Sequence, residues 1–168
     1  IKRVLDYLPI IWKGYDFDYR YATELFAHQL GRIADFLESD KAHTLSSGDN
    51  AKRIRTTLKL MKLVGDEEYA MEYFDYEVVE NYFVQCEDDE GYSTMETDHI
   101  SETYDEFFKK YPLIYKRVLD GEGPFPLWEG RTFADKRTIA MNIAHVNQER
   151  ARKALYKMIE RNIQSWWD

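Results

Sequence analysis

Two pairs of side chains have the types and spacing of metal ligands. Glu24 precedes His28 by four residues, and His145 precedes Glu149 by the same interval. Residues four apart lie on one face of a helix, so both side chains of a pair can reach one ion. Carboxylate-bridged di-iron bundles use a three-residue Glu-to-His spacing and two further Glu, which these pairs do not reproduce. Because both pairs fall on polar helix faces, we interpret them as solvated surface pairs, and a metal-dependent enzyme remains the alternative.

Other catalytic arrangements are weakly represented. The chain has neither a Gly-x-Ser-x-Gly turn nor a glycine-rich strand-to-helix loop that would hold phosphates. Its one cysteine, Cys86, precedes four consecutive acids, and such neighbours disfavour the thiolate. The many carboxylates leave a paired-carboxylate hydrolase open, but no pair is privileged. The sequence therefore favours a protein without catalytic residues, metal or cofactor.

Two lines of basic side chains have the spacing of a phosphate-binding surface. In each line Lys or Arg recurs every three or four residues, which places the charges along one side of a helix. The predicted anion-binding residues are Lys52, Arg55, Lys59 and Lys62 in the first ridge, and Arg150, Lys153, Lys157 and Arg161 in the second ridge. They could bind a small phosphorylated ligand, such as a signal nucleotide, or a nucleic acid. Alternatively, the ridges neutralise acids of the same chain or face water.

The middle of the chain, residues 66–106, is both acidic and aromatic. These residues include sixteen Asp or Glu, eight aromatics and no Lys or Arg, whereas the rest of the chain holds fifteen acids and twenty-three bases. A segment this acidic is typical of disorder, but its rings predict enough burial to order it.

Carboxylates held beside tyrosines can dock on a basic protein surface, with the rings as anchors. The predicted protein-binding residues are Tyr69, Glu72, Tyr73, Asp75, Tyr76 and Glu80. The alternative is a core helix whose acids point to water.

The elements that would position these residues all have helical periodicity. Apolar side chains recur with a helical spacing, and Ser93 with Glu96 can form a capping box. Helices are predicted from about residue 18 to 38, from 51 to 64, from 66 to 85, from Ser93 to an interruption at Pro112, and from a cap at Thr132 to Trp167. The predicted fold is all-α, an elongated helical bundle within a single domain, residues 1–168.

The last predicted helix is unusual in its length and in its apolar pattern. It would extend about 50 Å, which exceeds the width of a compact globule of this size. Its apolar stripe rotates by about 100° between the first half and the second. We therefore predict a bend or a change of neighbour near residues 147–150, and the neighbour could be a second copy of the chain.

The bulk properties limit the remaining possibilities. A length of 168 residues is enough for a core without disulfide or metal, and a single cysteine fits a reducing compartment. The longest early apolar run, Leu8–Trp12, is too short to span a bilayer, so we predict no membrane partner.

Three stretches resemble a group of small, mostly uncharacterised proteins encoded by tailed bacteriophages. They are Tyr15-Asp16-Phe17-Asp18, the sequence HTLSSGDNAKRIRTTL from His43 to Leu58, and the closing ERARKALYKMIERNIQSWWD. The resemblance implies a virus-encoded protein acting in the cytoplasm of an infected bacterial cell. We expect a non-catalytic binding protein that engages a host component, such as a defence nuclease or a signal nucleotide. A virion or assembly component is the alternative.

Overall fold

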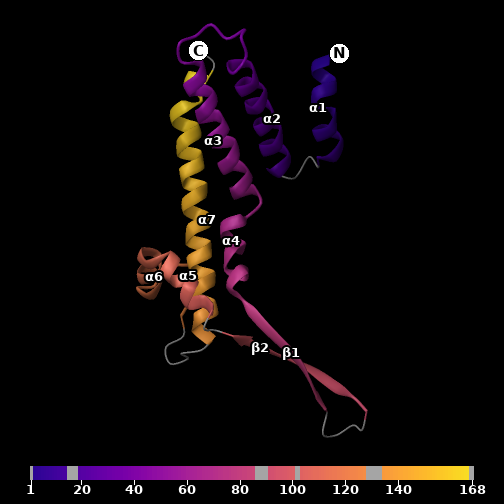
Figure 1. The fold of residues 1–168 in the computed structure, drawn as a ribbon, viewed down its shortest axis with the longest axis vertical. Coiled ribbons are helices and arrows are strands. Elements are labelled where there is room, and N and C mark those ends of the chain that lie inside the picture. The colour runs from indigo at the N-terminus through magenta and orange to yellow at the C-terminus, as the bar shows by residue number, and fades with distance from the viewer. Residues whose placement is uncertain (1, 15–18, 86–90, 101–102, 128–133, 167–168) are drawn as a thin grey trace. The chain divides into compact units, whose positions relative to one another are not determined.

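The chain folds into two compact units. The computed structural model describes residues 2–14, 19–85, 91–100, 103–127 and 134–166. Within these residues it contains seven α-helices and one two-stranded antiparallel sheet (Figure 1). Unit 1 comprises Ile1–Asp66 with Ala151–Asp168, and unit 2 comprises Glu67–Arg150. The described chain is mostly helical, but the sheet shows that the prediction of an all-α fold is wrong.

Unit 1 is built from helices. It contains α1 (Lys2–Lys13), α2 (Tyr19–Leu37), α3 (Ser47–Gly65), the end of α7 (Ala134–Asn162) and the short 3-10 helix η3 (Gln164–Trp166). The predicted apolar stripes of α2 and α3 form its core, which includes Leu30, Ile54, Leu155 and Trp166. The helical periodicity therefore predicted α2 and α3 correctly, because the stripe of each is buried against the other helix.

Asn50 stabilises the junction between α3 and η3. It belongs to a polar cluster that resembles a helix cap, but helix α3 already begins at Ser47. Asn50 is buried, and its Nδ2 donates a hydrogen bond of 2.9 Å to the backbone oxygen of Ser165. The short η3 segment, which ends at Trp166, is thus held on the core of unit 1.

Unit 2 combines short helices with the sheet. It contains α4 (Glu68–Met71), the 3-10 helix η1 (Glu72–Tyr76), β1 (Val78–Gln85), β2 (Ser93–Ile100), α5 (Tyr104–Lys110), α6 (Pro112–Leu119) and the first part of α7. Its core includes Tyr73, Tyr104, Phe107 and Ile143. The rings of Phe108 and Tyr115 stack at 4.8 Å between α5 and α6. Pro112 occupies the start of α6, where the missing N–H has no helical partner to lose.

A loop of unit 2 is fastened to α7 by one amide. Asn142 is buried, its Nδ2 donates a 2.8 Å hydrogen bond to the backbone oxygen of Phe125, and its Oδ1 accepts a 3.0 Å bond from the Phe125 N–H. Gly123 lies against the same amide with φ of 129°, and a Cβ there would meet Asn142 Oδ1 at 2.3 Å. The loop conformation therefore depends on both residues.

The sheet replaces two predicted helices. The predicted helix over 66–85 ends early, as α4 and η1, and its second half is strand β1. The predicted helix from Ser93 is strand β2, so the capping box with Glu96 does not form. The run from Val78 to Gln85 is rich in β-branched and aromatic residues, which fit a pleated strand better than a short helix.

Helix α7 contributes to both cores. Ile139, Ala140, Ile143 and Val146 are buried in unit 2, whereas Leu155 is buried in unit 1 with Ile159 packed beside it. The rotation of the apolar stripe thus corresponds to a change of neighbour along the helix. The predicted cap at Thr132 and the predicted end at Trp167 lie outside the described residues.

Candidate functional site

The β1–β2 hairpin is the candidate site because its side chains are exposed on both faces. Each residue of 80–85 and of 91–97 is exposed, and none of them belongs to the core of unit 2. The antiparallel register pairs Val78 with Ile100 at the base and Gln85 with Ser93 near the turn. A two-stranded hairpin is at best marginally stable in water by itself. Core formation therefore does not explain why these side chains have the types that they have.

One face of the hairpin is acidic. Residues directly opposite in an antiparallel pair share a face, so positions 80, 82, 96 and 98 lie together. The hydroxyl of Tyr82 donates a 3.2 Å hydrogen bond to the carboxylate of Glu96. The register pairs Glu80 with Asp98 and Tyr82 with Glu96, so the carboxylates of Glu80 and Glu96 share this face. No Lys or Arg occurs between Asp66 and Glu106, so the neighbouring sequence offers no compensation.

The other face carries an apolar pair beyond a polar one. Thr97 Oγ1 donates a 2.8 Å hydrogen bond to Asn81 Oδ1, which fixes the register near the middle of the strands. Further toward the turn, Phe83 lies opposite Met95, and their exposures are 75% and 58%. An exposed aromatic beside a methionine is typical of a contact surface for another protein.

The base of the hairpin is fixed to the rest of unit 2 by a salt bridge. Glu77 precedes β1, and its carboxylate accepts a hydrogen bond of 2.9 Å from Nε of Arg137 on α7. The Glu77 side chain is only 6% exposed. Because the desolvated carboxylate is paired, this bridge anchors the first strand where it leaves the core.

Most of the predicted protein-binding residues lie in the base instead of the exposed strands. Tyr73 is buried, Tyr69 is half-buried, and Tyr76 packs against Phe107 with ring centroids 5.1 Å apart. Asp75 and Glu80 are the two members of the predicted set that are exposed. The structure thus distributes the set between the core of unit 2 and its surface.

Glu72, another predicted contact residue, holds two side chains of unit 2. Its carboxylate accepts hydrogen bonds from Nζ of Lys110 and, at 2.7 Å, from the hydroxyl of Tyr111. Burial of the phenol, together with its bond to Glu72, raises the pKa of Tyr111 to about 12. These bonds stabilise the packing of η1 against α5.

The exposed hairpin rings were assigned to the core by the helical pattern. Tyr82, Phe83 and Tyr92 are exposed, whereas Tyr73 and Tyr104 are buried as expected. The alternation of side chains along a strand would have indicated this exposure, because it places Glu80 and Tyr82 on one face and Asn81 and Phe83 on the other. Cys86 and the acids Glu87–Glu90 lie outside the described residues.

The first basic ridge is partly neutralised by α2. Arg55 bonds Asp35 at 2.6 Å and Glu38 at 2.7 Å, and the hydrogen bond from Arg55 lowers the pKa of Glu38. Lys52 lies 3.9 Å from Asp49 with both side chains largely exposed, and Lys59 and Lys62 are exposed.

The second basic ridge is exposed along α7. Its members Arg150, Lys153, Lys157 and Arg161 are all exposed. A shallow depression of about 650 Å³ lies beside Lys153, Tyr156 and Lys157.

The predicted metal pairs belong to different units. Glu24 and His28 lie on α2 in unit 1, whereas His145 and Glu149 lie on α7 in unit 2. The His28 ring packs edge-on against Tyr7 at 4.8 Å. Among the residues that the structure describes, no group of three or more His, Cys, Asp or Glu could hold a metal ion.

Comparison with known proteins gives no relative. Neither protein-family models, nor curated proteins, nor solved structures match this chain. Within the described parts of the chain, each helix is too short or too polar to cross a membrane.

Proposed function

We propose that the protein is a non-catalytic binding protein whose β1–β2 hairpin docks on a basic surface of another protein. The observation that carries the proposal is the exposure of both hairpin faces, one with carboxylates and the other with Phe83 and Met95. The resemblance to phage proteins makes a bacterial host protein, in the cytoplasm of an infected cell, the proposed partner.

Charge complementarity identifies the kind of partner. Glu80 and Glu96 lie on the same face, and no Lys or Arg occurs between Asp66 and Glu106, so the free hairpin bears an unfavourable concentration of negative charge. Lys or Arg side chains of a partner would relieve this repulsion, and they would accelerate association at low salt. A second copy of the hairpin would instead add repulsion.

The exposed rings would supply affinity in addition to charge. Aromatic anchors contribute most of the binding free energy at many interfaces, whereas charges at the rim mainly affect the association rate. Phe83 is the most exposed large apolar side chain of the hairpin, so it is the proposed anchor.

The test compares capture of host proteins by the unmodified protein and by hairpin variants. Each purified protein is immobilised, incubated with extract of the bacterial host, and eluted with increasing salt for mass spectrometry. Phe83→Ala should weaken the binding of a specific partner by about 2 kcal/mol, which is roughly thirtyfold in Kd. The combined change Glu80→Gln and Glu96→Gln should slow association and flatten its dependence on salt.

Two matched controls separate docking from nonspecific attraction. Phe36→Ala removes an exposed ring from unit 1, and Glu106→Gln removes an exposed acid from α5. Both should bind the partner as the unmodified protein does. A partner that is retained equally by the hairpin variants, or lost equally with the controls, would refute the docking proposal.

The second basic ridge supports a second candidate function, the binding of a small phosphorylated ligand. Tyr156 is exposed beside Lys153 and Lys157, so a base could stack on the ring while the lysines contact phosphate. Nucleotide that copurifies with the protein should be lost when both lysines are changed to Ala. If the protein carries no nucleotide and binds none at millimolar concentration, this candidate is rejected.

A further inference from the structure

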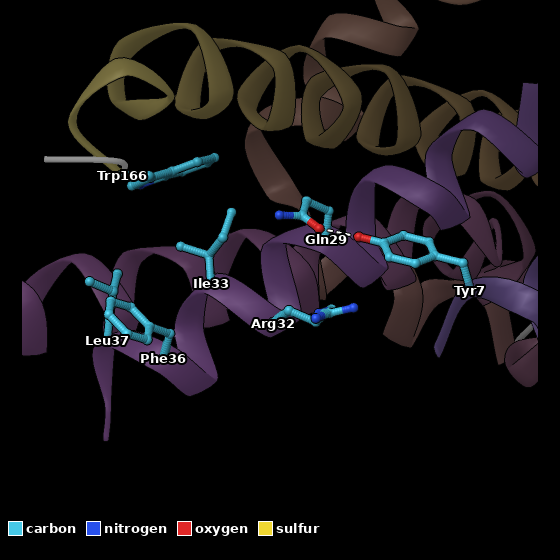
Figure 2. Close-up of a pocket in the computed structure, with 7 residues that line it drawn as sticks. All are labelled: Tyr7, Gln29, Arg32, Ile33, Phe36, Leu37 and Trp166. Carbon is cyan, nitrogen blue, oxygen red and sulfur yellow. Dashed lines mark hydrogen bonds between the residues drawn. The ribbon is translucent and has the colours of Figure 1, made fainter. Parts of the chain in front are cut away.

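Unit 1 contains a cavity that is independent of the hairpin. It has a volume of about 550 Å³ and lies between α1, α2 and η3 (Figure 2). Ligand sites in proteins commonly have volumes of about 300–1,000 Å³ and are lined by apolar side chains with a few polar groups. The cavity of unit 1 has this composition, as its walls show.

One wall is apolar and offers ring and branched side chains. Ile33 points from α2 toward the indole ring of Trp166, and Phe36 lies one turn further along α2 (Figure 2). Phe36 is 54% exposed although it is large and apolar. A ligand with an aromatic or aliphatic body would cover this ring and gain the free energy of burying it.

The same wall holds a hydrogen-bond donor without an acceptor. Trp166 is 1% exposed, and its Nε1–H is buried with no partner. Buried indole groups usually have a hydrogen-bond acceptor. The nitrogen itself is closed to solvent, so Trp166 contributes its ring to the wall and not an accessible donor.

A cation lies on the other side of the cavity. The Arg32 guanidinium lies 5.5 Å from the centre of the Tyr7 ring and 3.1 Å from a carboxylate oxygen of Asp6. Both members of this ion pair are about one-third exposed, so solvent screens their attraction. The guanidinium has five N–H donors, which leaves capacity for a second anion.

We propose that this cavity binds a small organic anion with an apolar body, of the class of the aromatic carboxylates. The carboxylate contacts Arg32, and the apolar body lies against Ile33, Phe36 and the ring of Trp166. This combination of one cation and an apolar wall disfavours neutral polar molecules and inorganic phosphate. The site requires no residue of unit 2.

The experiment is a titration of the full chain with 2-naphthoate, followed by the indole N–H signals in two-dimensional NMR. The chain has four tryptophans, and the Trp166 signal is assigned from the spectrum of Trp166→Phe. Saturable binding that moves the Trp166 signal, with Kd below about 1 mM, is the expected result. The uncharged 2-naphthamide should bind at least tenfold more weakly to the same protein.

Variants then test each wall. Arg32→Gln should weaken the binding of 2-naphthoate about tenfold and leave the affinity for 2-naphthamide unchanged, because only the charged contact is lost. Phe36→Ala should weaken both ligands, whereas Phe83→Ala in the hairpin should affect neither. The comparison of the two ligands on the unmodified protein keeps the proposal testable if Arg32→Gln does not fold.

Three results would overturn the proposal. The first is an unchanged Trp166 signal at saturating 2-naphthoate, and the second is equal affinity for the carboxylate and the amide. The third is equal weakening by Phe36→Ala and Phe83→Ala, which would indicate general adsorption to exposed rings.

Discussion

Glu72 and Glu80 have opposite roles although both belong to the predicted contact set. The Glu72 side chain is 14% exposed and accepts hydrogen bonds from Lys110 and Tyr111, whereas Glu80 is exposed on the hairpin. We therefore expect Glu72→Gln to destabilise unit 2 and Glu80→Gln to leave its stability unchanged. Binding of a partner should show the reverse pattern.

The expected loss for Glu72→Gln follows from its two hydrogen bonds. Bonds to a charged group contribute about 1.5–3 kcal/mol each, while a neutral amide retains about 1 kcal/mol as an acceptor. The Lys110 side chain is 49% exposed, so solvent screens part of that interaction. A net loss of about 2 kcal/mol is expected, which corresponds to roughly thirtyfold in the unfolding equilibrium.

Amide hydrogen exchange measured by mass spectrometry is the appropriate assay, because a chain with two units need not unfold in one step. Exchange of amides in α5 should become roughly thirtyfold faster in Glu72→Gln, in line with the expected free energy. The pKa of Tyr111 should also fall, because the carboxylate no longer accepts its proton in a hydrogen bond. Burial, the larger cause, should keep that pKa above the ordinary value. If Glu80→Gln accelerates exchange as much as Glu72→Gln does, the structural role assigned to Glu72 is wrong.

Three further substitutions in unit 2 have defined outcomes. Asn142→Ala removes both hydrogen bonds to the Phe125 backbone, and urea denaturation should show that the free energy of unfolding falls by about 2 kcal/mol. An unchanged free energy of unfolding would contradict the stabilising role of these bonds. Gly123→Ala should cost more than about 1 kcal/mol in the same assay, because of its positive φ and the contact with Asn142. Tyr111 keeps its proton in the folded state up to about pH 12 but loses it near pH 10 when unfolded, so its contribution to stability is complete below pH 10 and disappears as pH rises through 12. Tyr111→Phe should therefore show a smaller decrease in melting temperature over that range, and an equal decrease would contradict the assigned cause.

The sequence predicts α2 and α3 of unit 1 because their signals are local, whereas α1 was not predicted. The apolar stripe containing Leu30 and the stripe containing Ile54 each recur with helical spacing, and each is buried on the neighbouring helix. The same reasoning predicts the shift of the α7 stripe, from Ile143 in one core to Leu155 in the other.

The hairpin was not predicted because strand pairing is a nonlocal property. Residues 66–85 can be drawn as a helix with two apolar lines, and Ser93 with Glu96 matches a capping box equally well. The choice depends on whether Val78–Gln85 can pair with Ser93–Ile100, which no helical projection tests. The density of valine and aromatic residues in the first strand was the available local signal.

The chemistry of the candidate site can be inferred from the sequence, but only some of its residues can. Acidity and aromatic content are visible in composition, so a docking surface could be proposed and Glu80 could be included in it. Which rings are buried depends on tertiary packing, and so Tyr73 could not be distinguished from Phe83. The pairing of Arg55 with Asp35 and Glu38 likewise depends on how α2 and α3 pack.

The acids of the hairpin also bear on solubility. Among the described residues each strand of the sheet pairs only with the other, and open strand edges readily join their counterparts on other molecules into extended sheets. Carboxylates repeated on one face oppose that edge-to-edge pairing at neutral pH, as charged residues beside aggregation-prone segments do in other proteins. Strong acidification would remove this protection and leave Phe83 and Met95 beside open strand edges. Purified material should accordingly be stored well above the pH range in which side-chain carboxylates take up protons.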